Sequence, residues 1–320
     1  MLHVRVVSPP GATEGLTGRL AADPGIRNLV VLPGAARHPD GDSVQFDLID
    51  QFANRVLHEL RAQIGAGSSI VVQSVDVSIE AAATAEGTAK AHRYADVPPV
   101  WDLVEAKIRA GGEYPPSFFT LLVIAGLIGA VGILTNSQIL IVAAMVVGPE
   151  YSAIMATALG LDKRDRGAVG RGLAALTVGF ALAVLATLVF ALLIRWSGAT
   201  PKLYEQGVRP VSDLINSPNV FSVIVAVLAG LVGVVSLTES RANALIGVFI
   251  SVTTIPAASD MGLSAAYGSW TEARGSIFQL LLNVAVLIVV GAAGLRLQRA
   301  LWRNRAERAA ARTRRPAPPG

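Results

Sequence analysis

Apolar and polar positions alternate along the first eighty residues in a pattern that predicts a small α+β domain. Leu2, Val4 and Val6 occupy every second position, as in a half-buried strand. Residues 52–64 instead carry an apolar side chain every fourth position, which is typical of a helix with one buried face. The expected elements are a strand at 2–6, a helix at 12–22, strands at 26–32 and 43–48, a helix at 52–64 and a strand at 70–79. This βαββαβ order is that of a ferredoxin-like unit, which we assign to residues 1–80.

Residues 81–113 are expected to connect this domain to a membrane. The segment up to about residue 98 is rich in Ala, Thr, Gly and Pro, a composition that favours a linker. Residues 100–110 then place apolar side chains on one side of a short helix. We expect this amphipathic helix to lie at the membrane surface.

Six apolar stretches, each near the ~20 residues needed to cross a bilayer, fill residues 114–298. They predict an α-helical membrane bundle with spans at about 117–135, 138–161, 172–194, 219–237, 242–266 and 276–295. Pro149 and Pro256 interrupt the second and the fifth stretch. Because proline removes a hydrogen bond inside a helix, both of these spans are expected to be broken.

The first and fourth stretches resemble each other, which predicts an internal repeat. Residues 123–137 read VIAGLIGAVGILTNS, and residues 227–240 read VLAGLVGVVSLTES. Each is followed by a stretch with a central proline, so the bundle is expected to contain two three-helix units. An odd number of spans makes the second unit enter from the opposite face, which gives an inverted repeat of the kind found in secondary transporters. Chance similarity between apolar helices is the alternative.

The amino-acid composition argues against an ordinary soluble enzyme. The chain of 320 residues is 52% hydrophobic and 16% charged, with a mean hydropathy of +0.53, whereas soluble domains carry about 25% charged residues. It has no cysteine, which excludes disulfides, thiolate metal sites and cysteine nucleophiles. Its four histidines all lie in the first third without regular ligand spacing. No phosphate loop, dinucleotide fingerprint or nucleophile elbow is present in the sequence, so we expect neither an enzyme nor a bound cofactor or metal.

The net charge of +4 is unevenly distributed. Residues 162–171 carry four basic side chains, and the tail at 299–320 carries seven arginines and one glutamate. Basic loops favour the cytoplasmic side, so both termini are expected there. The three basic residues of the loop at 195–218 weaken this contrast without reversing it. We expect the tail to bind anionic lipids of the bilayer, and not nucleic acid, because it follows directly on a span.

Polar residues inside the apolar stretches are the candidate site. A carboxylate such as Glu150 costs about 2.5–3.5 kcal/mol at mid-bilayer, and a cost of that size points to a use. One interpretation is a site where Glu150 titrates beside carbonyl groups freed by the proline. The other is a protonated Glu150 bonded to a neighbouring helix, or one lying in the interface. The candidate ion- or solute-binding residues are Gly148, Pro149, Glu150, Ser251, Thr253, Thr254, Pro256, Asp260 and Asn283.

Each of the other candidates also has a structural interpretation. Ser251, Thr253 and Thr254 can bond backbone groups that Pro256 frees. Asp260 either shares a site with Glu150 or faces the interface. Asn283 and Gln279 lie on one helical face, where polar groups join helices or contact a substrate.

Two stretches of the sequence resemble a known family. Residues 136–149 read NSQILIVAAMVVGP and residues 244–256 read ALIGVFISVTTIP, and Leu282 and Asn283 follow in the last span. These stretches are similar to the bacterial "domain of unknown function 389" proteins, also called the uncharacterised hydrophobic domain family. The resemblance covers the six spans and implies a multi-pass protein of the bacterial inner membrane. It implies no established activity and no catalytic residues.

Two functions from different classes follow. The first is a transporter or channel for a small solute or ion, which passes near Glu150 and Pro256 and is modulated by the N-terminal domain. The alternative is a non-transporting membrane sensor or scaffold whose N-terminal domain binds a small ligand or a protein. Six spans make a small bundle, so a homo-oligomer is expected in either case.

Overall fold

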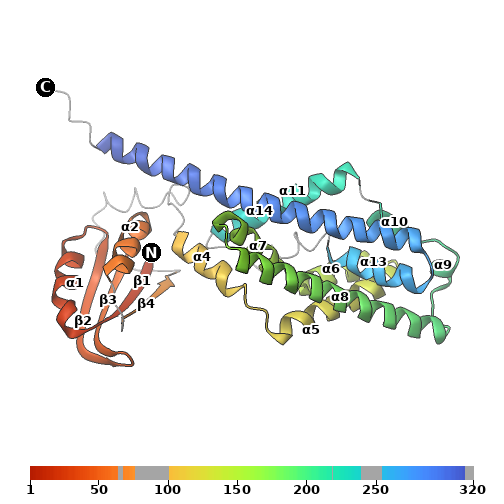
Figure 1. The fold of residues 1–320 in the computed structure, drawn as a ribbon, viewed down its shortest axis with the longest axis horizontal. Helices are drawn as coiled ribbons and strands as arrows, with labels where there is room; N and C mark the ends of the chain where they lie inside the picture. Colours follow the sequence, from red (N-terminus) through yellow and green to blue (C-terminus); the bar gives the residue numbers. More distant parts are fainter. Residues whose placement is uncertain (64–67, 76–100, 218, 239–253, 314–320) are drawn as a thin grey trace. The chain divides into compact units, whose positions relative to one another are not determined.

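The computed structural model describes residues 1–63, 68–75, 101–217, 219–238 and 254–313, in two compact units. The first unit comprises Met1–Leu103 and the second Val104–Gly320, so the boundary lies within a helix, α4 (Trp101–Ala110). The chain is mostly helical, with one small antiparallel sheet at its N-terminal end (Figure 1).

The first unit has the predicted element order. It consists of β1 (Leu2–Ser8), α1 (Pro10–Ala22), β2 (Ile26–Arg37), β3 (Asp40–Leu48), α2 (Asp50–Gln63) and β4 (Ser69–Ser74). The strands form a four-stranded sheet in the order β2-β3-β1-β4, and all neighbouring strands are antiparallel. The predicted strand at 70–79 and helix at 52–64 extend partly beyond the described residues, as does the linker up to residue 100.

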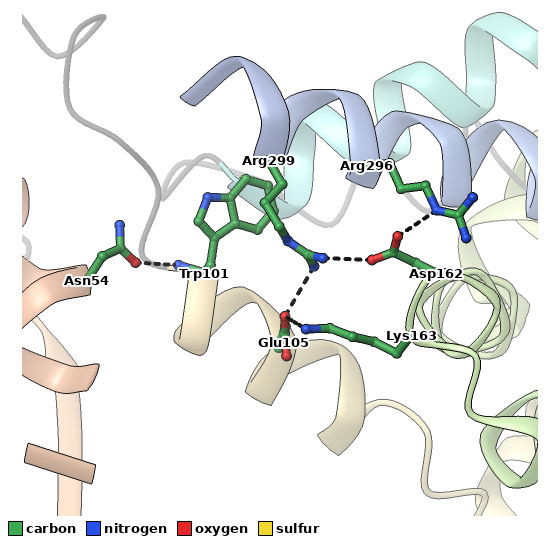
Figure 2. Close-up of polar contacts among 7 residues, drawn as sticks. All are labelled: Asn54, Trp101, Glu105, Asp162, Lys163, Arg296 and Arg299. Atoms are coloured by element: carbon green, nitrogen blue, oxygen red, sulfur yellow. Dashed lines mark hydrogen bonds and ion pairs between the residues drawn. The ribbon is translucent and has the colours of Figure 1, made fainter. Parts of the chain in front are cut away.

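Alternate side chains of β1 and β3 point to opposite faces of the sheet, and one of these faces forms the core of the first unit. Val4 and Phe46 face a core that both helices cover, to which Leu20 and Leu60 contribute. The next residues along the two strands, His3 and Asp47, are paired across the sheet and point to its opposite face. There, Nδ1 of His3 lies 2.8 Å from the carboxylate of Asp47. Within the same unit, the Trp101 backbone amide donates to the side chain of Asn54 (Figure 2).

The second unit is an apolar helical bundle. Its helices after α4 are α5 (Pro116–Leu134), α6 (Gln138–Val147), α7 (Glu150–Lys163), α8 (Arg166–Trp196), α9 (Lys202–Glu205), α10 (Pro210–Ile215), α11 (Val220–Thr238), α13 (Ile255–Ala266) and α14 (Trp270–Thr313). Four of them, α5, α8, α11 and α14, are long and apolar enough to cross a membrane. The pair α6 and α7 passes the same test together, with a bend of 52° at its break.

The expected spans therefore appear as four continuous helices and one bent pair among the described residues. The fifth expected span, at 242–266, is described only from Thr254 onward, and this half forms α13. Apolar side chains such as Leu185 and Leu193 on α8 remain exposed, 56% each. Exposure of so much apolar surface to water would be unfavourable, so these findings support a membrane protein.

Short α13 lies at the centre of the bundle. It packs against α5, α8 and α14, and α6 also touches it (Figure 1). Close approach to α5 depends on Gly129, because a Cβ atom there would collide with the Ser259 hydroxyl. That hydroxyl donates to the Gly126 carbonyl at 3.0 Å. A polar group of α13 thus bonds the neighbouring backbone.

Ion pairs join α4, α7 and α14 at one end of the bundle (Figure 2). Arg296 and Arg299 of α14 both reach the carboxylate of Asp162, at 2.8 and 2.9 Å. Arg299 also pairs with Glu105 of α4, as does Lys163 at 2.7 Å. The basic residues near the start of the tail therefore have protein partners. The side chains from residue 302 onward lie outside the described part of the chain.

Candidate site at two helix breaks

The second span breaks at Gly148 and Pro149. α6 ends at Val147, and α7 begins at Glu150 with Pro149 as its N-cap residue. At this position the missing N–H of proline costs little, because the first amides of a helix have no partner inside it. Ser152 donates its hydroxyl to the Pro149 carbonyl at 3.0 Å, which satisfies part of the opened backbone.

Glu150 is the first residue of α7 and is completely buried. Burial by protein rules out the interpretation that its side chain lies in the lipid headgroups. An acidic residue in the first turn compensates the partial positive charge of the helix N-terminus. The sequence thus places its most costly side chain where the backbone itself favours a negative charge.

The second proline starts a helix in the same way. α13 begins at Ile255, with Thr254 as N-cap residue and Pro256 in its first turn. The Thr254 hydroxyl donates to Oε1 of Glu150 at 2.8 Å, and both side chains are completely buried. Two residues 104 positions apart, each at the start of a helix, are therefore in contact.

Glycine at position 148 permits this contact. An added Cβ atom would collide with Oε2 of Glu150 and would lie 3.0 Å from the Ile255 side chain. The structure thus brings together five of the candidate residues, namely Gly148, Pro149, Glu150, Thr254 and Pro256. Ser251 and Thr253 lie outside the described residues.

Asp260 belongs to a second polar group. It follows Thr254 by six residues, roughly 9 Å along the axis of α13, and is also completely buried. Ser212 of α10 and Ser276 of α14 donate to its two oxygens at 2.5 and 2.6 Å. Ser264 lies 3.4 Å from the second oxygen. Three hydroxyl donors suit a carboxylate, which accepts hydrogen bonds on both oxygens.

Polar side chains continue along α14. Glu272, Ser276, Gln279 and Asn283 are three or four residues apart and so share one helical face. With Asp260 and Ser264 of α13 we call them the polar strip. Ser264 lies 3.4 Å from Glu272, and Ser276 lies 2.6 Å from Asp260. Both contacts fit an antiparallel register, in which the strip runs toward Asn283 along α14 and toward the start of α13 along the neighbouring helix.

Sequence reasoning missed the partners of Asp260. Ser212 lies in a short helix between spans, and no local pattern marks it. Ser276 could have been found, because the spacing of Glu272, Ser276, Gln279 and Asn283 is visible in the sequence. Among the described residues, no group of three or more His, Asp or Glu side chains could hold a metal ion.

Comparisons with known proteins give one family match and no activity. Residues 145–289 match the family model described as "Domain of unknown function (DUF389)". The match includes Gly148, Pro149, the start of α13 and all of the polar strip. No curated protein and no solved structure matches the chain.

Proposed function

We propose that this chain, whose residues 145–289 match the DUF389 family model, transports a small solute or ion across the bacterial inner membrane. The observation that carries the proposal is the buried contact between Thr254 and Glu150, at the starts of α13 and α7. Irregular backbone at membrane depth is tolerated where protein or a wet cavity surrounds it. Paired helix breaks near mid-membrane are the usual place of substrate sites in inverted-repeat transporters.

The polar strip supports a route to this contact. From Glu272 to Asn283 it covers roughly 16 Å of α14 at 1.5 Å per residue, about half of a hydrocarbon core of ~30 Å. Oε1 of Gln279 is buried and has no hydrogen-bond partner among the described residues. Such an acceptor calls for water or an ion as its partner. Glu150 is the titrating group at the inner end of this route.

The meeting of the two breaks also supports an inverted repeat. Pro149 and Pro256 hold equivalent positions in the two predicted three-helix units. Two units related by a two-fold axis in the membrane plane would bring equivalent residues together at that axis. The contact between Glu150 and Thr254 joins residues next to the two prolines, although the two residues are not themselves equivalent.

Flux into proteoliposomes tests the proposal. The purified full chain is reconstituted with a trapped pH-sensitive dye, and decay of an imposed pH gradient is followed, with a Na⁺ gradient measured in parallel. We expect Glu150→Gln to slow the flux at least ~10-fold, which corresponds to 1.4 kcal/mol of barrier. Glu205→Gln, at an exposed acid of α9, is the matched control and should conduct like wild type. Equal flux in wild type and Glu150→Gln would remove Glu150 from the mechanism.

One observation favours the alternative of a non-transporting sensor or scaffold. The carboxylate of Asp260 has protein hydroxyls on both oxygens, so it needs no solute. On this alternative, wild-type proteoliposomes hold both gradients as well as empty liposomes do. A small ligand or protein would then bind to residues of the N-terminal unit.

The orientation with both termini in the cytoplasm is tested by cysteine labelling. The native chain has no cysteine, so single substitutions report one position each. Gly170→Cys stands in the basic loop region and Ser197→Cys follows α8, and both positions are exposed. We expect an impermeant maleimide to label position 197 in intact cells, and position 170 only after permeabilisation. The reverse pattern would invert the orientation.

A further inference from the structure

A cavity of about 140 Å³ lies at the end of the bundle where α7 passes into α8. Its walls come from the end of α4 and the turn that follows, from Tyr114 just before α5, and from the ends of α7 and α8 that meet there. Since ~10–15 Å³ already holds a water molecule, this space has room for a small anionic group with attached water.

The cavity is lined by both apolar and basic side chains. Tyr114 and Leu159 are among its apolar lining residues, and Arg109, Lys163 and Arg171 provide three cations against one carboxylate, Asp165. Lys163 is occupied by its ion pair with Glu105. Arg109 and Arg171 have no ion pair within 4 Å among the described residues.

Helix ends do not supply the positive charge. Asp165 caps α8 and accepts from the Ala168 amide at 3.0 Å, so the first turn of that helix already has an anion. This hydrogen bond, together with the charges of Arg171 and Arg109, lowers the pKa of Asp165. The carboxyl end of α7, which also lines the cavity, carries partial negative charge. Attraction for a further anion therefore comes from the two arginine side chains.

The position relative to the apolar helices identifies the ligand class. The cavity lies where α5 and α8 begin and α7 ends, so its basic edge stands at the level where apolar side chains give way to polar ones. That level is the boundary between lipid tails and headgroups in a membrane. Basic pockets between membrane helices bind lipid phosphates there.

We propose that this cavity binds the phosphate group of an anionic phospholipid, with Arg109 and Arg171 as its ligands and the apolar wall against the start of the acyl chains. The site is distinct from the helix breaks and does not depend on transport. It is also distinct from the arginine-rich tail, which was expected to attract the membrane surface as a whole.

Native mass spectrometry of the full chain in detergent tests the site, with phosphatidylglycerol as the probe and phosphatidylcholine as the zwitterionic comparison. Arg109→Gln/Arg171→Gln should weaken binding of the first phosphatidylglycerol at least ~10-fold, since hydrogen bonds to charged groups are the strong ones. Arg164→Gln/Arg166→Gln removes the same charge from exposed positions that do not line the cavity and should change binding less than about threefold. An equal loss in both double variants would overturn the proposal.

Two further arms separate the remaining outcomes. Ala156→Leu fills the cavity from its apolar side without changing charge, and should also weaken the lipid. Thermal midpoints of all variants show whether each has folded. Glycerol phosphate, which has the phosphate and no acyl chain, should compete poorly. If it competes as well as the lipid binds, the site holds a soluble phosphate and the lipid assignment is wrong.

Discussion

Replacement of Gly148 by alanine tests whether the meeting of the two helix breaks is as tightly packed as its geometry indicates. Gly148 has φ −64° and ψ 124°, a conformation that alanine also adopts, so the backbone gives no reason for glycine. On conformational entropy alone, Gly148→Ala would stabilise the fold by about 0.4–1 kcal/mol. The new Cβ atom would, however, overlap Oε2 of Glu150 and lie 3.0 Å from Ile255, and both neighbours are completely buried.

Overpacking of this kind costs about 1–3 kcal/mol, so the steric term wins and the net loss is roughly 1–2 kcal/mol. The control is Gly170→Ala on α8, where an added Cβ atom meets nothing within 4 Å. There the helix gains about 0.5–1 kcal/mol. The two variants should thus differ by about 1.5–3 kcal/mol, or roughly 3–12 °C in Tm at 2–4 °C per kcal/mol.

Scanning fluorimetry of both purified variants in detergent measures the difference. Partial recovery of Tm in Gly148→Ala/Glu150→Ala would identify the Glu150 carboxyl as the obstacle. If Gly148→Ala melts at or above the temperature of Gly170→Ala, the two breaks do not approach each other as described. The proposed transport site would then lose its geometric basis.

Three further outcomes are expected from the contacts around and beyond the site. Ser276→Ala removes one of three hydroxyl donors from buried Asp260 and should lower the free energy of unfolding by about 1–3 kcal/mol in a detergent unfolding titration. An unchanged free energy of unfolding would contradict the hydrogen bond from Ser276 to Asp260. Asp162→Asn should cost about 1 kcal/mol at low salt and less at 0.5 M NaCl, because its arginine partners are partly exposed; a salt-independent loss would contradict the ion pairs. Burial raises the pKa of Asp47, but hydrogen bonds from Asn28 and His3, together with the positive charges of His3 and the N-terminus, outweigh burial and leave the pKa below its usual 3.8. Because ionised Asp47 stabilises the folded state, this contribution to the free energy of unfolding is present above pH 3.8 and is lost as the pH falls through the lower pKa of the folded state. Hydrogen exchange of the β1 amides should therefore accelerate in that pH range in wild type and change little in Asp47→Asn.

Elements with a strong local period could be predicted from the sequence. Alternation in β1 and the four-residue period in α2 gave the order of the first unit, and α8 extends the expected span at 172–194 by one or two turns. Pro149 also marked the break between α6 and α7, and Pro256 lies in the first turn of α13, since proline is unfavourable in a helix interior.

The pairing between distant residues could not be predicted in this way. Nothing local to Thr254 indicates that its hydroxyl reaches Glu150, because the contact depends on how α7 and α13 pack. The partners of Asp260 come from three different helices for the same reason. The sequence was compatible with Asp260 either at the membrane interface or inside the bundle. In the structure Asp260 is completely buried.

Charge balance explains why one acid stands where two helices begin. Each helix N-terminus carries about half a positive charge, so the starts of α7 and α13 together nearly match one carboxylate. Ionised Glu150 therefore leaves the meeting point close to neutral, and a buried neutral site costs far less than a buried unpaired charge. An anion could take the place of this carboxylate only if Glu150 moved away or gained a proton, whereas a cation would have to compete with both helix ends for it. Either exchange couples the charge of Glu150 to what occupies the site, and that coupling distinguishes a transport site from a helix break that merely terminates two spans.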